Sequence, residues 1–175
     1  MTSAVIAQLY EEGKLTPDDR IVEILGIQPP FSDPRVANIS INQLLNHRAG
    51  FDRQRSGDSM TSDNPWCPKK ISHLRTMKLD FRPGDLFSYS NVGYCLLGAA
   101  IARIEGGSLE RSIRARLLTP NRLSDTIPTT IRRFDGREAG YFFGAGDSEA
   151  ELLQLDYESM VASGGWSGTA ENMLA

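Results

Sequence analysis

The sequence predicts a mainly α-helical fold with one short β-hairpin. Apolar residues recur at helical spacing in several segments, most clearly from Val92 to Glu105. Helix-capping residues and glycines stand where these segments begin and end. The dipeptide Asp135-Gly136 is typical of a tight turn between two strands. We expect residues 1–175 to form a single domain, since a chain of this length buries enough surface for one core.

The first helix is predicted over residues 2–15. Ile6, Leu9 and Tyr10 share one face, and Gly13 stands at the position of a C-terminal glycine. No capping residue precedes this helix.

A second helix is predicted over residues 16–25. Thr16 has the character of an N-cap, Pro17 suits the first helical position, and Asp18 suits the first turn. Residues 26–36 contain three prolines and are predicted to be a loop.

A third, short helix is predicted over residues 40–50, because Ser40 and Gln43 have the spacing of a capping box. Residues 51–70 are polar and without periodicity, which predicts a long loop of the kind that is often functional. Residues 71–81 have a weaker helical pattern.

The best helix, from residue 92, is predicted to end at Gly106. Its apolar stripe consists of Tyr94, Leu97, Ile101 and Ile104. Ser108 is predicted to cap the next helix, residues 130–143 to form the β-hairpin, and Thr169 to cap a last helix.

The composition excludes some classes of partner. Apolar residues make up 40% and charged residues 23% of the chain, and the net charge is −3. These values are typical of a globular protein and give no electrostatic footprint for nucleic acid or an anionic membrane. The arginines in the middle of the chain are predicted to form a solvated helical face. They are Arg103, Arg111, Arg114, Arg116, Arg122, Arg132 and Arg133.

No apolar run reaches the roughly 18–20 residues of a membrane span, so no membrane segment is expected. The first ten residues have neither the basic region nor the cleavage site of a signal peptide. A cytoplasmic location and, with a signal upstream, a periplasmic or secreted one both stay open.

The cysteines and histidines do not have metal-binding spacing. Cys95 lies in an apolar helical run and is interpreted as a small buried residue, and a bridge to Cys67 is the less favoured alternative. Neither His47 nor His73 has a second ligand at suitable spacing, so both are interpreted as surface or capping residues. We expect no metal and no cofactor.

Tyr89 and Asn91 are the candidate site residues. Side chains two apart in an extended segment face the same side, so the two are predicted to share a cleft while Ser90 turns away. A phenol acts as a base where cationic neighbours favour its ionised form, and a carboxamide can both donate and accept. The pair therefore suits acyl transfer, with Tyr89 catalytic and Asn91 binding the substrate. The alternative is structural: Asn91 as a helix N-cap and Tyr89 as a partly buried anchor.

Six ordered blocks carry a resemblance to a known family. They are AQLYEEGKLTPDD, ISINQLLNHRAGF, FRPGDLFSYSNVGYCLLGAAIARIEGGSLERSI, LLTPNRLSDT, AGYFF and ASGGWSGTAENMLA. This succession resembles the serine β-lactamase family, in the branch of class C β-lactamases, esterases and D-Ala-D-Ala carboxypeptidases. The resemblance implies the helical subdomain of the β-lactamase/DD-peptidase fold, with most of the central antiparallel sheet absent. It also implies that Tyr89 assists proton transfer and that Asn91 binds the amide of a small-molecule or peptide acyl substrate.

The chain departs from the family pattern in informative ways. The block NHRAGF departs from the usual His-Thr-Ser-Gly form at Arg48 and Ala49, and no Ser-x-x-Lys motif occurs. The resemblance places that motif's lysine about two residues and its serine about five residues before Met1. It places the Lys-Thr-Gly strand beyond Ala175. The resulting hypothesis is that the chain is part of a serine hydrolase. By itself, the chain is expected to be nearly inactive.

Two alternatives belong to other classes. The chain is a non-catalytic binding or assembly module if the absent sheet leaves the first helix and the stripe from Tyr94 to Ile104 exposed. That reading predicts a homodimer or the capture of missing strands. The other alternative is a plain helical interaction domain with a coincidental Tyr-x-Asn.

Overall fold

The structure is a computed structural model that describes residues 1–58, 62, 64–123, 126–128 and 157–173. Its α-helices are α1 (Thr2–Glu11), α2 (Ile21–Leu25), α3 (Ile41–Leu45), α4 (Asn91–Glu105), α5 (Leu109–Ile113) and α7 (Tyr157–Met160). Short 3₁₀ helices cover Pro34–Asn38, Ile71–Thr76 and Glu171–Met173, and a π-helical turn covers Arg114–Leu118. The strands are β1 (Ile127–Pro128) and β2 (Trp166–Ser167). The predicted helical character is confirmed for the described residues.

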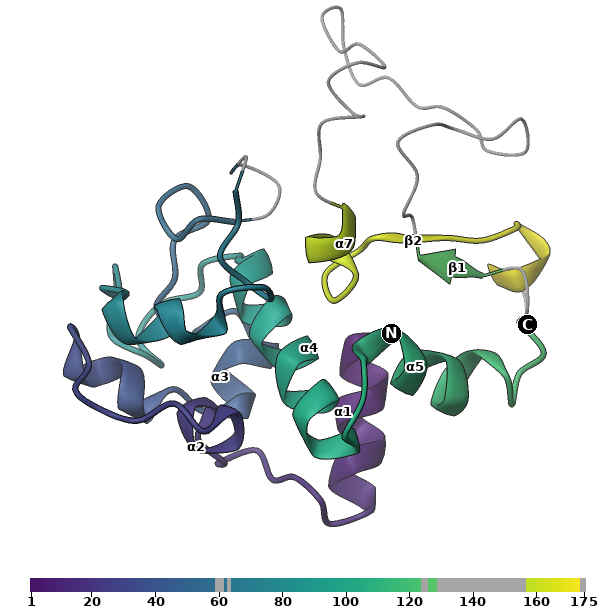
Figure 1. Cartoon of the computed structure of the whole chain (residues 1–175), viewed down its shortest axis with the longest axis horizontal. Coiled ribbons are helices and arrows are strands. Elements are labelled where there is room, and N and C mark those ends of the chain that lie inside the picture. Colours follow the sequence, from purple (N-terminus) through teal and green to yellow (C-terminus); the bar gives the residue numbers. More distant parts are fainter. Residues whose placement is uncertain (59–61, 63, 124–125, 129–156, 174–175) are drawn as a thin grey trace, which may run out of the picture.

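Helix α4 is the centre of the fold. It packs against α1, α2, α3 and α5 (Figure 1), and Leu97 and Ile101 of its predicted stripe are fully buried. Gly106 ends it with a φ of +66°, a conformation that glycine adopts without the cost that a Cβ would add. Within the described residues, no helix has the length and apolar character needed to span a membrane.

The face of α1 that the binding-module alternative expects to be exposed is buried. Val5, Ile6 and Leu9 have no exposed surface, because α1 packs against α4 and α5. The expectation that missing sheet segments leave this face open is therefore not met, and in the α4 stripe Leu97 and Ile101 are buried while Tyr94 and Ile104 remain partly exposed. The helices cover one another.

Helix α2 begins later than the sequence predicts. Thr16 does not cap it: the carboxylate of Asp19 accepts from the backbone N–H and the hydroxyl of Thr16, at 2.8 and 2.7 Å, and closes a turn. Arg20 is extended and pairs with Ser40 in an isolated antiparallel bridge, so the helix starts only at Ile21. The pairing of Arg20 with Ser40 therefore overrides the local sequence preference for a helix that starts at Thr16.

The capping box of α3 is confirmed. The hydroxyl of Ser40 accepts from the N–H of Gln43 at 3.3 Å, and the side chain of Gln43 accepts from the N–H of Ser40 at 2.9 Å. The helix ends at Leu45, earlier than predicted, and Gly50 lies beyond it with a φ of +96°. A Cβ added to Gly50 would lie 2.5 Å from the carbonyl oxygen of Phe81, so only glycine fits this close approach.

The last described segments return to the start of the chain. Thr2 donates its hydroxyl to the carbonyl of Ala162 at 2.6 Å. The segment around Ala162 also packs closely against Gly98 of α4. A Cβ added to Gly98 would lie 2.7 Å from the Cβ of Ala162, so a larger residue would not fit there. Strands β1 and β2 pair antiparallel, with Ile127 opposite Ser167.

Two further predictions concern the C-terminal half. Ser108 caps α5 as predicted, accepting from the N–H of Arg111 at 3.1 Å. Thr169 accepts from the N–H of Asn172 at 3.3 Å, before a single 3₁₀ turn. The predicted hairpin over residues 130–143 lies outside the described residues.

The interpretation of the arginines as a solvated face is wrong for Arg116. Its side chain is only 13% exposed and forms ion pairs with Glu12 at 2.6 Å and Glu105 at 3.0 Å. The bond from Arg116, followed by that from Lys14, lowers the pKa of Glu12 to about 2. Arg116 thereby joins the C-terminal ends of α1 and α4, which local spacing could not reveal.

The less favoured alternative for the cysteines is the one observed. Cys67 and Cys95 form a disulfide between the long loop and α4, with their Cα atoms 6.1 Å apart. Cys95 is buried as predicted, but it is buried as half of a bridge. The loop over residues 51–70 is thus covalently attached to the central helix.

Asp33 ties two loops together. Its carboxylate accepts from the side chain of Arg35 at 2.6 Å and from the backbone N–H of Leu79 at 3.0 Å. These bonds, with that to Arg35 the largest cause, lower the pKa of Asp33 to about 2. A lowered carboxyl pKa means that the unfolded chain takes up a proton at higher pH than the folded one. The stability that ionised Asp33 adds to the folded state is fully present above about pH 4 and is lost as the pH falls toward 2.

We therefore expect the variant Asp33→Asn to have a flatter acid profile. Between pH 6 and pH 2, the free energy of unfolding should fall by about 1–2 kcal/mol less in the variant than in the wild type. The difference is modest because the Arg35 side chain is 44% exposed, so solvent weakens its ion pair with Asp33. Urea unfolding at each pH measures this difference. Equal losses in both proteins would contradict the assignment.

Candidate functional site

The structure brings Tyr89 and Asn91 together, as their spacing in an extended segment predicted. The phenolic OH of Tyr89 donates to Oδ1 of Asn91 at 3.1 Å. Tyr89 is 45% exposed, Asn91 is buried, and Ser90 between them is also buried. Helix α4 begins at Asn91 with Ser90 at the N-cap, so the alternative that Asn91 itself is the N-cap is wrong.

Asp58 is a member of the site that the sequence analysis missed. Its side chain is fully buried, and its carboxylate accepts from both the backbone N–H and Nδ2 of Asn91, each at 3.0 Å. The only sequence signal was its place in the long polar loop, which predicted function without naming a residue.

His47 holds the segment that carries Tyr89. Its backbone has a φ of +54°, its carbonyl accepts from the N–H of Ser88 at 2.9 Å, and its Nδ1 accepts from the N–H of Ser90 at 3.3 Å. Its ring lies 4.5 Å from that of Tyr89 and 5.1 Å from that of Tyr94, between centroids. His47 was predicted to be a surface or capping residue; the structure places it half-buried among aromatic rings.

The protonation state of His47 follows from these contacts. Burial lowers the pKa of the imidazole, which favours the neutral ring. In the neutral ring Nδ1 accepts from Ser90, so the proton is on Nε2. A neutral His47 therefore supports the backbone on both sides of Tyr89 without placing a cation beside it.

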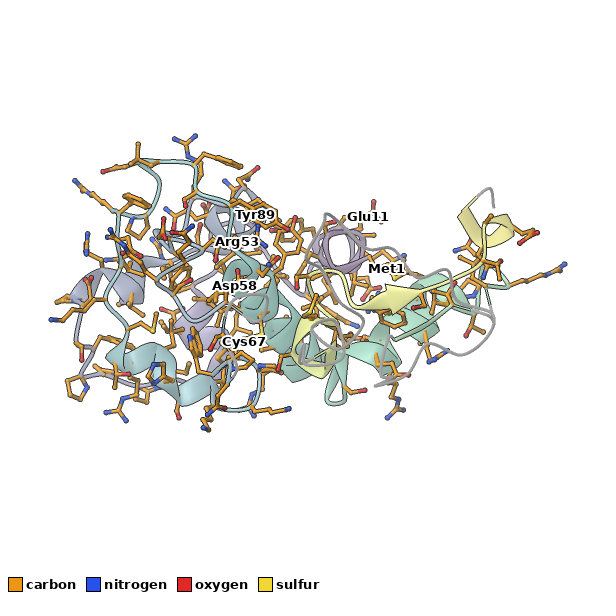
Figure 2. The ribbon with its side chains drawn as sticks, turned by 90° about the horizontal axis from the view of Figure 1, so that it is seen from above. Met1, Glu11, Arg53, Asp58, Cys67 and Tyr89 are labelled. Carbon is orange, nitrogen blue, oxygen red and sulfur yellow. A yellow bond between two sulfur atoms is a disulfide. The ribbon has the colours of Figure 1, made fainter. Side chains whose placement is uncertain are left out.

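Arg53 supplies a positive charge to the phenol. Its guanidinium lies 5.6 Å from the centroid of the Tyr89 ring, within the range of a cation–π contact. Figure 2 shows Arg53, Asp58 and Tyr89 around the start of α4, with Arg53 and Asp58 coming from the same loop. The contact therefore places a guanidinium over the face of the Tyr89 ring.

A pocket of about 670 Å³ adjoins this cluster on the side of α3. Its lining consists of Asn42, Gln43, Leu45, Asn46, His47, Arg48, Gly84 and Phe87. Neither Tyr89 nor Asn91 lines it, so it is not the shared cleft that was predicted for the pair. One of its lining residues, His47, has its ring 4.5 Å from that of Tyr89, between centroids.

The comparisons with known proteins decide the family. The sequence model of the family described as Beta-lactamase matches residues 1–175. The chain belongs to the Beta-lactamase family. This confirms the resemblance to the serine β-lactamase family, which is a family of serine hydrolases.

Several Beta-lactamase relatives are similar over the chain. A putative fimbrial assembly protein FimD, serogroup D, of Dichelobacter nodosus is 40% identical over 179 residues, which cover 99% of this chain and 44% of that protein. A putative D-alanyl-D-alanine carboxypeptidase of Escherichia coli (strain K12) is 28% identical over 139 residues, covering 72% and 31%.

A solved structure with the same fold is that of the D-amino acid amidase from Ochrobactrum anthropi SV3 in complex with L-phenylalanine. The TM-score is 0.75 at 25% identity, covering 99% of this chain and 49% of that one. The chain thus spans less than half the length of each of these three relatives.

Proposed function

We propose that the chain is the helical part of a longer serine hydrolase and supplies Tyr89 and Asn91 to its acyl-transfer site. The observation that carries this is the hydrogen bond of 3.1 Å between the two side chains at the start of α4. In this proposal Tyr89 takes part in proton transfer, and Asn91 donates an amide N–H to the carbonyl of the substrate. No cofactor enters the reaction.

The reaction is acylation of a serine followed by hydrolysis. The serine oxygen forms a bond to the substrate carbonyl carbon, the C–N or C–O bond to the leaving group breaks, and the serine proton passes to that leaving group. Water then releases the acyl group. The substrate class is a β-lactam, a D-amino-acid peptide or amide, or an ester, in keeping with the carboxypeptidase and the amidase among the relatives.

The arrangement of the helices supports this placement. Figure 1 shows α1 and α4 beginning on the same side of the molecule, and the two helices pack together. The family's Ser-x-x-Lys motif is expected directly before α1. A segment entering α1 therefore approaches the side on which Tyr89 and Asn91 lie.

The chain alone should be almost inactive. Its 175 residues contain no Ser-x-x-Lys motif, so the serine and its lysine come from elsewhere in the longer protein. The backbone donors of an oxyanion hole are expected there too, and each missing donor costs about 10²- to 10³-fold in rate.

The binding-module alternative receives no support from the fold. It required an exposed face on α1 and along the stripe of α4. Ile6, Leu9, Leu97 and Ile101 are instead fully buried within the chain.

Intact-mass spectrometry with a penicillin tests the proposal. The full gene product that contains these residues should gain the mass of one penicillin on a serine of a Ser-x-x-Lys motif, whereas the 175-residue chain should gain none. Hydrolysis of a chromogenic β-lactam and of a nitrophenyl ester shows which substrate class turns over. A covalent adduct on the 175-residue chain would overturn the proposal, because nothing in it should be able to attack.

A further inference from the structure

Asp58 brings a carboxylate from the long loop to the first residue of α4. Its Oδ2 accepts from the backbone N–H of Asn91 and its Oδ1 from Nδ2, both at 3.0 Å. The first N–H groups of a helix have no partner inside the helix, and the hydroxyl of Ser90 does not cap them. Asp58 therefore takes over the capping of α4 across 33 residues of sequence.

The chemistry of Asp58 also decides which way the amide of Asn91 points. A carboxylate only accepts hydrogen bonds, so a donor must face each of its oxygens. With the amide turned by a half rotation, the oxygen of Asn91 would meet Oδ1 of Asp58 where the donor now stands, and the two would repel. The nitrogen of Asn91 is therefore held toward Asp58, and its oxygen remains for the phenolic OH of Tyr89.

We propose that Asp58 is a positioning residue that sets the direction of the hydrogen bond between Tyr89 and Asn91. It acts through Asn91: while the amide nitrogen is held, the phenolic hydrogen points at the amide oxygen and the phenol's lone pairs point away from it. The second N–H of the same amide is the donor that the function proposed above assigns to the carbonyl oxygen of the substrate. The consequence for the reaction rests on the function proposed above.

The loop is built to keep Asp58 in place. Trp66 donates its indole N–H to the carbonyl of Ser56 at 2.8 Å. Its ring covers Gly57, where an added Cβ would lie 3.0 Å from the ring. Cys67, the next residue, is bonded to α4 through the disulfide. The backbone on the N-terminal side of Asp58 is thus held under Trp66, and Trp66 is held by the attachment to α4.

The variant Asp58→Asn tests the proposal, because its amide offers one oxygen to the two donors of Asn91. The new amide oxygen should keep the backbone N–H, while its NH₂ faces the oxygen of Asn91 and turns that amide over. The nitrogen of Asn91 then faces Tyr89. In NMR spectra of the 175-residue chain, the NOE from the Asn91 side-chain NH₂ to the Tyr89 ring should grow severalfold relative to wild type.

Asp80→Asn is the matched control. It makes the same chemical change in a carboxylate that holds the same loop, since Oδ2 of Asp80 accepts from the N–H of Asp52 at 3.0 Å. The control should keep the wild-type NOEs. An Asp58→Asn spectrum with unchanged NOEs overturns the proposal.

If Asp58→Asn does not fold, NOEs measured on the wild-type chain test the proposal instead. An NOE from the Asn91 NH₂ to the β-protons of Asp58 supports the proposal. A stronger NOE from that NH₂ to the Tyr89 ring overturns it.

Kinetics on the full gene product separate this inference from the function on which it rests. Asp58→Asn should lower kcat by about 10- to 100-fold, since small misplacements of reacting groups have effects of this size, with little change in KM. Asp80→Asn should stay near wild type. A turned amide with an unchanged kcat overturns the positioning role. A wild-type product without turnover overturns the proposed function, and the NMR comparison still decides what Asp58 does.

Discussion

Replacing Tyr89 with phenylalanine is expected to lower kcat of the full gene product by about 10²- to 10⁴-fold, the usual contribution of a general acid or base. The substitution removes only the phenolic OH, which donates to Asn91 at 3.1 Å, and it keeps the ring that contacts His47 and Arg53. Because Tyr89 is 45% exposed, the fold should lose less than about 1 kcal/mol. Steady-state kinetics and thermal unfolding measured on the same sample separate the two effects.

Tyr94→Phe is the matched control for this prediction. Tyr94 also stacks on His47, with ring centroids 5.1 Å apart, and its OH donates to the carbonyl of Leu45 at 3.4 Å. The variant loses the same atom from the neighbouring ring, so its kcat should remain within a few-fold of wild type. Equal losses in Tyr89→Phe and Tyr94→Phe would show that the phenol of Tyr89 has no special part in the reaction.

Removing the disulfide is expected to cause the largest loss of stability. The double variant Cys67→Ser with Cys95→Ala should lower the free energy of unfolding by about 3–4 kcal/mol. The bridge joins positions 28 residues apart, so it restricts the unfolded chain as well as fastening the long loop to α4. Urea unfolding of the 175-residue chain without reductant measures the difference.

Wild-type protein unfolded in the presence of a thiol reductant is the control for this experiment. It should match the double variant, because both lack the same covalent link. A double variant that loses less than about 1 kcal/mol would mean that the bridge adds little to the constraints already present in the loop.

The elements predicted correctly from the sequence are those with local causes. The end of α4 at Gly106, the capping box of Ser40 with Gln43, and the cap of α5 at Ser108 each depend on residues a few positions apart. The contact between Tyr89 and Asn91 was predictable for the same reason, since the two are neighbours in an extended segment.

The features that the sequence did not reveal all have distant partners. The start of α2 is set by the pairing of Arg20 with Ser40, and Arg116 is held by ion pairs with Glu12 and Glu105, at the ends of two helices. In the site, Asp58 and His47 lie 33 and 43 residues from the groups they contact. Capping residues and periodicity carry no information about such partners, so a position like Asp58 was one polar loop residue among many.

The bond between Thr2 and Ala162 has a kinetic consequence. It joins groups 160 positions apart, and the entropy lost in closing a loop increases with the logarithm of its length. The contacts among α2, α3 and α4 span shorter stretches and can form sooner. During synthesis, the contacts among α2, α3 and α4 can therefore form before Ala162 reaches its place beside Gly98.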